Sequence, residues 1–188
     1  NHAGTTPMQL RHDAAFVAAE VVTFVRRLAA EMGGTQVATV GRLTLRPDLV
    51  NVVARQAVCT VDLRNTDGDL LAEAERRLHA RTAELAATEG VEVAWERLAR
   101  FDPVAFDPAV VDLVESTARR HGHTVARLPS GAGHDAQMLA RMCPAGMVFV
   151  PSIAGISHNP AEATAPEHLE AGAQVLLDVL VELAGGAS

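Results

Sequence analysis

Two loops rich in small residues carry histidines that could take part in catalysis or ligand binding. One loop, residues 128–135, carries His134, and the other, residues 151–160, carries His158. Each follows an apolar segment that is typical of a strand, and in an open parallel sheet ligands bind beyond the carboxyl ends of the strands. We therefore expect the two loops to open onto the same edge of the sheet. Their small residues would let backbone amides come close to a ligand there.

Other interpretations of these loops remain open. His158 could equally be a loop histidine that is hydrogen-bonded to backbone. A zinc site needs three or four ligands, and the chain has no HExxH motif and no paired CxxC motif, so any co-ligands of His158 would lie elsewhere. Ser130 could be a nucleophile, but it lacks the GxSxG elbow, and its Ser-Gly-Ala-Gly sequence is more typical of a turn that holds a ligand.

A predicted strand over residues 51–64 carries two further candidates, Asn51 and Arg64. Its apolar face consists of Cys59, Val61 and Leu63, and its polar face includes Asp62 and Arg64. The guanidinium fork of Arg64 could bind a carboxylate through two hydrogen bonds. The alternative is a surface ion pair with Asp62, which would contribute little to stability. Asn51 could equally belong to a turn.

The elements that must position these residues fall into two groups. Apolar residues at helical spacing predict helices over residues 12–32 and 69–88, and alternation predicts strands over 37–45, 51–64 and 91–96. The order helix, strand, strand, helix, strand is that of a ferredoxin-like βαββαβ unit without its first strand.

A different unit begins after the break at residues 101–103. Asp107 and Pro108 are typical of a helix start, and a Thr164-to-Glu167 capping box opens a final helix. Between them we expect strands at 124–128 and 147–150 and a short helix at 135–141. Strands that alternate with helices indicate a parallel sheet covered on both faces, so the predicted fold class is α/β.

Composition restricts the partners and the compartment. The chain has 188 residues and a formal net charge of −7, and all sixteen of its basic side chains are arginine. This balance argues against nucleic acid and against an anionic membrane surface as partners. The apolar stretches stop short of the roughly 20 residues that a membrane span needs. Cys59 and Cys143 are expected to be buried free thiols in a reducing cytosol, which places the protein in the cytoplasm.

Four segments together resemble a known family. They are residues 1–8 (NHAGTTPM) with Arg11 and Asp13, residues 61–64 (VDLR), residues 130–135 (SGAGHD) and residues 155–158 (GISH). In this combination the chain resembles the dinuclear-metal aminoacylase and exopeptidase family, in its N-carbamoyl-L-amino-acid hydrolase and allantoate amidohydrolase branch. The resemblance extends over essentially the whole chain.

The resemblance implies a domain division and roles for individual residues. Residues 1–100 would be most of a lid or dimerisation domain, and residues 101–188 the C-terminal part of a zinc-exopeptidase-like α/β catalytic domain. The residues that match the family's site are His2, which helps to polarise the scissile carbonyl; Asn51 and Arg64, which hold the substrate's carboxylate end; the substrate-binding His134; Gly155, in a loop that approaches the substrate; and the metal ligand His158. One departure lies at residues 53–55, where Val-Ala-Arg replaces the usual proline and glycine.

The resemblance also implies an activity. The intact enzyme would be a cytoplasmic homodimer, joined through the lid, that uses two divalent metal ions (zinc, manganese, cobalt or nickel). It would hydrolyse linear C–N amide bonds of N-carbamoyl-L-amino acids or of ureido acids such as allantoate. The other metal ligands and the glutamate general base of the family would precede Asn1, so we expect the 188-residue chain alone to be inactive. Two alternatives are a dimerisation or small-molecule-binding module and a peptidase or aminoacylase of the same family.

Overall fold

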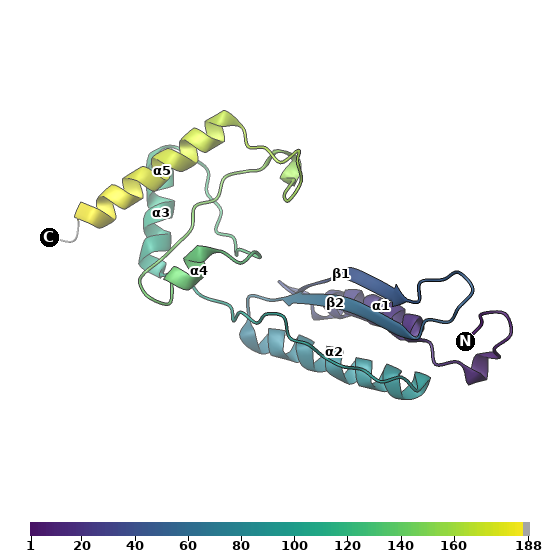
Figure 1. Cartoon of the computed structure of the whole chain (residues 1–188). Coiled ribbons are helices and arrows are strands. Elements are labelled where there is room, and N and C mark those ends of the chain that lie inside the picture. Colours follow the sequence, from purple (N-terminus) through teal and green to yellow (C-terminus); the bar gives the residue numbers. More distant parts are fainter. Residues whose placement is uncertain (186–188) are drawn as a thin grey trace. The chain divides into compact units, whose positions relative to one another are not determined.

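The computed structural model describes residues 1–185 and divides the chain into two compact units, Asn1–Pro103 and Val104–Ser188 (Figure 1). The first unit consists of two long helices and a β-hairpin, preceded by a short 3-10 helix, Met8–Leu10. The second unit is helical, with long connections between its helices. Helices and strands follow one another in the first unit in the order that the sequence predicts, helix, strand, strand, helix.

The two helices of the first unit lie within two residues of their predicted bounds, and each begins after a capping aspartate. Helix α1 runs over Ala14–Met32, and the Asp13 carboxylate accepts hydrogen bonds from the first backbone amides. Helix α2 runs over Gly68–Glu89, is capped in the same way by Asp67 and ends at Gly90 in the left-handed conformation (φ 68°). A side-chain oxygen before a helix and glycine after it satisfy backbone groups that the helix itself leaves without partners. Both helix predictions are confirmed.

The hairpin consists of β1 (Val37–Arg46) and β2 (Gln56–Arg64), paired antiparallel from Val37 opposite Arg64 to Arg46 opposite Gln56. The register shifts between Val40 and Arg42, which leaves Gly41 as a bulge. Strand β2 begins later than the predicted residue 51. The reason is that Val52 instead bridges to His2 near the start of the chain, so residues 51–55 belong to the connection between the strands.

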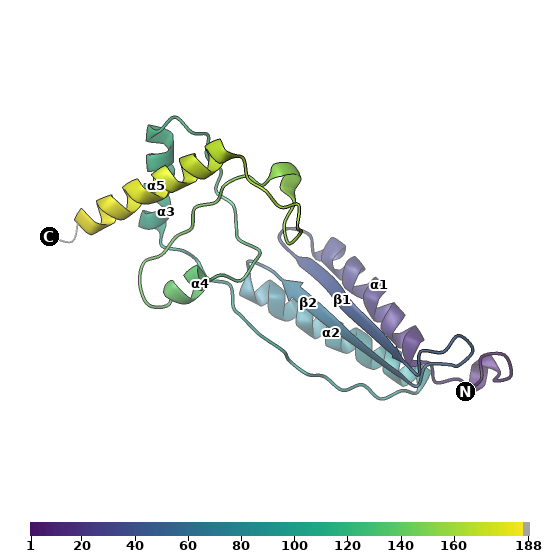
Figure 2. The same ribbon diagram turned by 45° about the horizontal axis from the view of Figure 1, so that its top comes forward.

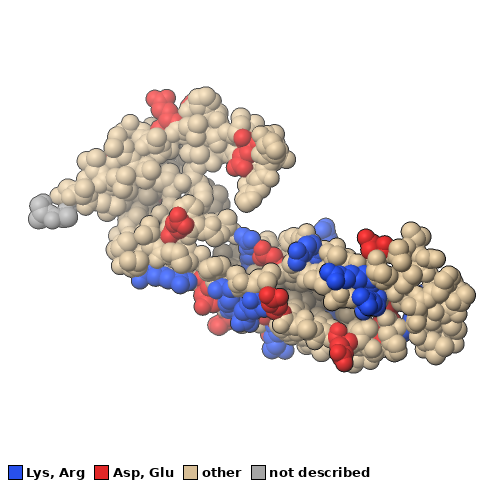
Figure 3. All heavy atoms as spheres, in the orientation of Figure 1, with Lys and Arg blue, Asp and Glu red and all other residues tan. Residues whose placement is uncertain are grey.

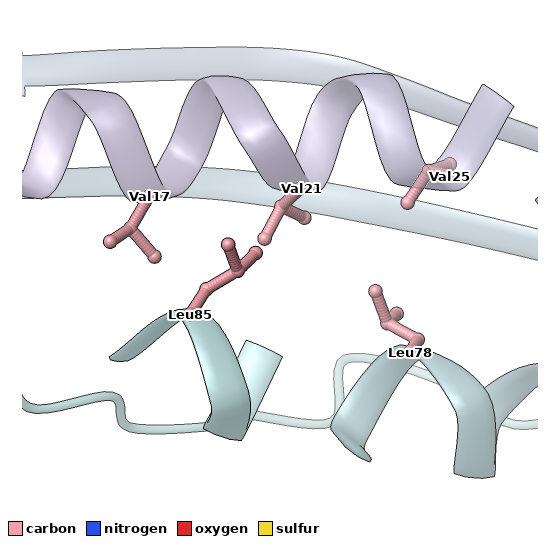
Figure 4. Packing of buried hydrophobic residues seen from close by; sticks show 5 residues of the cluster. All are labelled: Val17, Val21, Val25, Leu78 and Leu85. Atoms are coloured by element: carbon pink, nitrogen blue, oxygen red, sulfur yellow. The ribbon is translucent and has the colours of Figure 1, made fainter. Parts of the chain in front are cut away.

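The core of the first unit lies between the helices and one face of the hairpin. Figure 4 shows Val17, Val21 and Val25 of α1 facing Leu78 and Leu85 of α2. Against this cluster pack several side chains of the hairpin and of the segment after α2, among them Cys59, Val61, Leu63 and Val91. The predicted apolar face of β2 is therefore confirmed. Burial of this kind, at about 25 cal/mol per Å² of apolar surface, is the main force that holds such a unit together.

Three predicted strands are wrong in the part of the chain that the structure describes. Residues 91–96, 124–128 and 147–150 are extended connections, and the one sheet present is β1 with β2. Alternation or apolarity selects a strand only where a neighbouring strand accepts its ladder hydrogen bonds. The last strand of a βαββαβ unit pairs with the first, and residues 1–185 contain no such strand. For the same reason the predicted parallel sheet of the second unit is not formed.

Within the described residues the second unit contains the 3-10 helix Ile153–Gly155 and three α-helices, and its main packing contact joins the first and last of these α-helices. These are α3 (Pro108–Arg120), which is capped by Asp107; α4 (Asp135–Leu139); and α5 (Pro166–Gly185). Helices α3 and α5 cross each other in Figure 2. The core between them contains Ala118 of α3 with Val175 and Val179 of α5. The ring of His121 also lies 2.7 Å from a carboxylate oxygen of Asp178. Much of the apolar surface of α5 remains exposed, including Leu176, Leu177, Leu180 and Val181.

Charged side chains of both signs are intermixed on the surface of the first unit. Arginines and carboxylates alternate over the face seen in Figure 3, and several pairs are in contact, such as Arg100 with Glu75 at 2.7 Å. No helix within residues 1–185 combines the length and the apolarity needed to cross a membrane.

Candidate active site

The loop at the start of the chain positions His2. The His2 Nδ1 accepts a hydrogen bond from the Gly4 backbone amide at 3.0 Å, and the His2 carbonyl accepts one from the Thr6 amide at 3.2 Å. The first contact orients the ring and the second closes the loop. His2 is itself exposed, so its other ring nitrogen, Nε2, is available to a ligand.

A short antiparallel bridge places the His2 loop beside Asn51. The Ala3 amide donates to the Asn51 carbonyl at 2.8 Å, and the Val53 amide donates to the Asn1 carbonyl at 2.8 Å. The two segments are about fifty positions apart along the sequence, yet they lie at one end of the hairpin, close to the label N in Figure 1. The structure therefore brings the backbones of two predicted site residues, His2 and Asn51, close together.

Arg64 is paired with Asp62. The Arg64 Nε lies 3.0 Å from Asp62 Oδ1 and the Arg64 Nη2 lies 2.7 Å from Asp62 Oδ2, so the fork and the carboxylate meet through two parallel hydrogen bonds. These hydrogen bonds lower the pKa of the Asp62 carboxyl and raise that of the Arg64 guanidinium. Each side chain remains 49% exposed. The geometry is that of bidentate carboxylate recognition, and exposed pairs of this kind are weak enough for another carboxylate to compete.

Arg64 lies at the opposite end of the hairpin from His2 and Asn51. It pairs with Val37 at the start of β1, whereas the connection that holds Asn51 follows Arg46 at the end of β1. Eight residue steps along β2 correspond to roughly 26 Å at about 3.3 Å per residue. The structure thus places the two parts of the predicted carboxylate-binding set, Asn51 and Arg64, too far apart for both to contact one small ligand within one chain.

In the second unit His134 caps the short helix α4. Its Nδ1 accepts a hydrogen bond from the Ala136 backbone amide at 3.0 Å. The preceding loop is held in part by the Ser130 hydroxyl, which donates to the Ala132 carbonyl at 3.1 Å. This contact occupies the Ser130 hydroxyl with local backbone, as expected of a turn residue rather than an activated nucleophile.

His158 lies in a tightly turned loop. Its backbone has φ 55°, its amide donates to the Glu162 Oε2 at 2.8 Å, and Gly155 just before it has φ 67°. Positive φ is costly for residues other than glycine, so the surrounding hydrogen bonds must hold His158 in place. Among these, the Ser152 hydroxyl donates to the Ile156 carbonyl. The side chain of His158 is exposed.

The described residues do not by themselves form a metal centre. Within residues 1–185 no three His, Cys, Asp or Glu side chains lie close enough together to hold an ion. A single imidazole does not hold a divalent metal, which takes at least three protein ligands in catalytic zinc sites. Nor does the hollow in the second unit mark the site: it is lined by residues 105–108, 140 and 143–145 and includes none of the predicted site residues.

Arg11 is a residue with no role predicted from the sequence. It lies partly buried between the 3-10 helix and α1, and it donates hydrogen bonds to carbonyls of the His2 loop. Its position three residues after the NHAGTTPM segment, residues 1–8, could have drawn attention to it. The hydrogen bonds themselves could not be predicted, because they depend on how the loop folds back.

Comparison with known proteins decides the family. Residues 8–182 match peptidase family M20/M25/M40. The chain belongs to this family. It is 36% identical to the N-carbamoyl-L-amino-acid amidohydrolase of Rhizobium meliloti, over 97% of this chain and 44% of the relative. It is 32% identical to the allantoate amidohydrolase of Bacillus subtilis (strain 168), over 98% of this chain and 45% of the relative.

Solved structures agree with this assignment. An amidase of the hydantoinase/carbamoylase family from Burkholderia multivorans superposes with a TM-score of 0.91 and 43% sequence identity, covering 97% of this chain and 44% of that chain. The α/β fold class and the resemblance to the carbamoylase branch of the family are thereby confirmed. The M20 chain described here spans a little under half the length of the curated relatives it matches.

Proposed function

We propose that this chain is part of a metal-dependent amidohydrolase that acts on N-carbamoyl-L-amino acids or related ureido acids such as allantoate. The observation that carries the proposal is similarity along almost the whole chain to enzymes of these two names. In such a reaction water is added across a C–N bond, so that an N-carbamoyl amino acid yields the amino acid, carbon dioxide and ammonia. The site residues of this chain have the chemistry for the two ends of such a substrate.

At the reacting end, His2 and His134 are the proposed catalytic residues. An imidazole N–H directed at the carbamoyl oxygen would stabilise the negative charge that develops there when water adds to the carbon. Gly155 has positive φ and no side chain, and we propose that its loop lets backbone approach the substrate. At the other end Arg64, with Asn51, would bind the carboxylate.

We propose His158 as one ligand of a centre of two divalent ions, zinc, manganese, cobalt or nickel. Bound there, such ions would act as Lewis acids and lower the pKa of a coordinated water. The remaining ligands and the general base would have to come from residues outside this chain. On this proposal the 188 residues alone are inactive.

The separation of Arg64 from His2 and Asn51 favours a homodimer. A ureido acid is far shorter than the nine-residue strand β2, so one bound molecule cannot contact both ends of one hairpin. If both ends serve the same kind of site, two copies of the lid must contribute to it. We propose that residues 1–100 are this lid and dimerisation domain and residues 101–188 the C-terminal part of the catalytic domain. We further propose that the enzyme acts in the cytoplasm without a nucleic-acid or membrane partner.

A substrate panel tests the proposed function. A protein that contains this chain at the length of its relatives, loaded with manganese or zinc, is assayed against N-carbamoyl-L-amino acids, allantoate, dipeptides and N-acyl amino acids. The proposal expects the first two classes to be hydrolysed with the higher kcat/KM. Preference for dipeptides or acyl amino acids would move the enzyme to the peptidase or aminoacylase branch of the family.

A further inference from the structure

We propose that Arg11 is a positioning residue, which holds the Asn1–Thr6 loop so that the Gly4 amide keeps His2 as the neutral imidazole protonated on Nε2. The consequence for catalysis rests on the role proposed above for His2. The arrangement of the loop itself does not depend on that role.

Arg11 joins the two arms of the loop through three hydrogen bonds. Its Nη2 donates to the Ala3 carbonyl at 2.6 Å and to the Thr6 carbonyl at 2.9 Å, and its Nε donates to the same Thr6 carbonyl at 3.0 Å. The planar guanidinium presents its donors in a fixed geometry, which lysine does not reproduce. Ala3 is also the residue whose amide bonds to Asn51. Arg11 therefore holds the carbonyl of the residue that follows His2, while the bridge holds the amide of the same residue.

The partner of the His2 ring determines its tautomer. A backbone amide can only donate a hydrogen bond, so the Nδ1 that lies 3.0 Å from the Gly4 amide must be an unprotonated acceptor. In a neutral imidazole the proton is then on Nε2. This is the tautomer that can donate a hydrogen bond to a substrate oxygen without any change of protonation.

Gly4 itself belongs to the arrangement. A Cβ at this position would lie 3.3 Å from the His2 Cε1 and 3.5 Å from its Nδ1, so the ring would have to move by a few tenths of an ångström. The absence of a side chain at residue 4 is thus what lets the amide and the ring come this close.

Two other histidines provide a comparison within the chain. His134, the second proposed catalytic histidine, accepts a hydrogen bond at Nδ1 from the amide two residues further along, as His2 does. His12, which has no proposed role, has the opposite arrangement: its Nδ1 lies 2.8 Å from the Glu89 carbonyl, an acceptor only, so its Nδ1 must carry the proton. The Nε2–H form is therefore found at both proposed catalytic histidines and not at His12.

The ¹⁵N chemical shifts of the ring nitrogens test the proposal in the 188-residue chain, at about pH 8.5, where an ordinary imidazole is neutral. The His2 signals are assigned by their loss in His2→Gln. We expect His2 to be protonated on Nε2 and His12 on Nδ1. Arg11→Met should move the His2 shifts toward the average of the two tautomers and leave His12 unchanged, and the matched Arg26→Met, in the exposed part of α1, should change neither. His2 protonated on Nδ1 in the unmodified chain, or unaffected by Arg11→Met, would overturn the proposal.

If Arg11→Met unfolds the chain, the ¹⁵N shifts of His12 will no longer show the Nδ1-protonated form. The unmodified chain and Gly4→Ala then still test the proposal, because Gly4→Ala should move the His2 ring shifts in the same direction as expected for Arg11→Met. In an active protein of the relatives' length, Arg11→Met should lower kcat on the order of a hundredfold with a smaller change in KM, and Arg11→Lys should recover part of the loss. If no ureido acid is hydrolysed, the proposed function fails while the tautomer result stands. If His2→Ala lowers kcat and Arg11→Met does not, the positioning role alone fails.

Discussion

The geometry of Arg64 predicts that Arg64→Lys weakens substrate binding although the positive charge is kept. Arg64 meets the Asp62 carboxylate through two parallel hydrogen bonds at 3.0 and 2.7 Å, and we expect a substrate carboxylate to be held in the same way. A lysine ammonium is a point donor without the fork, so it retains the charge and one hydrogen bond. The expected effect is a rise in KM with little change in kcat.

The magnitude follows from the hydrogen bond that is lost. A hydrogen bond to a charged group contributes about 1.5–3 kcal/mol, and taking the lower half of that range because Arg64 is half exposed gives about 1.5–2 kcal/mol. At 1.4 kcal/mol per factor of ten, KM should rise about 10- to 30-fold. Asp62→Asn removes the carboxylate that competes with the substrate. Since an exposed pair contributes at most about 1 kcal/mol, this variant should lower KM by up to about fivefold.

The assay is steady-state hydrolysis by the metal-loaded protein of the relatives' length, with two substrates that differ only in the carboxylate: an N-carbamoyl-L-amino acid and the matching N-carbamoyl amine. The 10- to 30-fold effect of Arg64→Lys should be confined to the first substrate. An unchanged KM for the carbamoyl amino acid, or an equal loss with both substrates, would refute the assignment of Arg64 to the carboxylate.

Three further predictions concern the fold, its response to pH and the metal. Leu28 is fully buried in α1, so Leu28→Ala should lower the free energy of unfolding, measured by urea titration, by about 2–5 kcal/mol. Leu43→Ala, at a half-exposed position, should lower it much less. The fold lowers the pKa of the Asp62 and Asp178 carboxyls, so the stability that their ionised forms contribute is complete above the unfolded-state pKa of about 3.9. This stability is lost as pH falls through the lowered pKa values of the folded state. The thermal midpoint should therefore drop below about pH 4, and less steeply in Asp62→Asn. His158→Ala should reduce the metal content of the long protein as measured by elemental analysis; normal content would remove His158 from the ligand set.

Local signals in the sequence were sufficient for the helices. Three helices begin after an aspartate whose carboxylate accepts hydrogen bonds from the first backbone amides, namely Asp13, Asp67 and Asp107. The spacing of apolar residues along each helix then sets its buried face. These features involve residues within a few positions of one another. They could therefore be predicted without knowledge of the rest of the fold.

Strands and site geometry depend on distant partners and could be predicted only in part. The alternation of residues 91–96 is real, since Val91 packs on the core, but no neighbouring strand within residues 1–185 completes a ladder. Likewise, nothing local indicates that Val52 pairs with His2 or that Arg64 lies at the far end of the hairpin from Asn51. The site residues were predicted from motif similarity, whereas the separation of His2 and Asn51 from Arg64 at the two ends of the hairpin required the register of the sheet.

Ammonia release from an N-carbamoyl-L-amino acid is the decisive measurement of the proposed activity, made with the metal-loaded protein of the relatives' length and with its His2→Ala variant. We expect the unmodified protein to release ammonia with a higher kcat/KM than it shows for hydrolysis of a dipeptide. We expect His2→Ala to lower the kcat of ammonia release on the order of a hundredfold, as for removal of one oxyanion donor. Faster cleavage of the dipeptide, or equal ammonia release by His2→Ala, would contradict it.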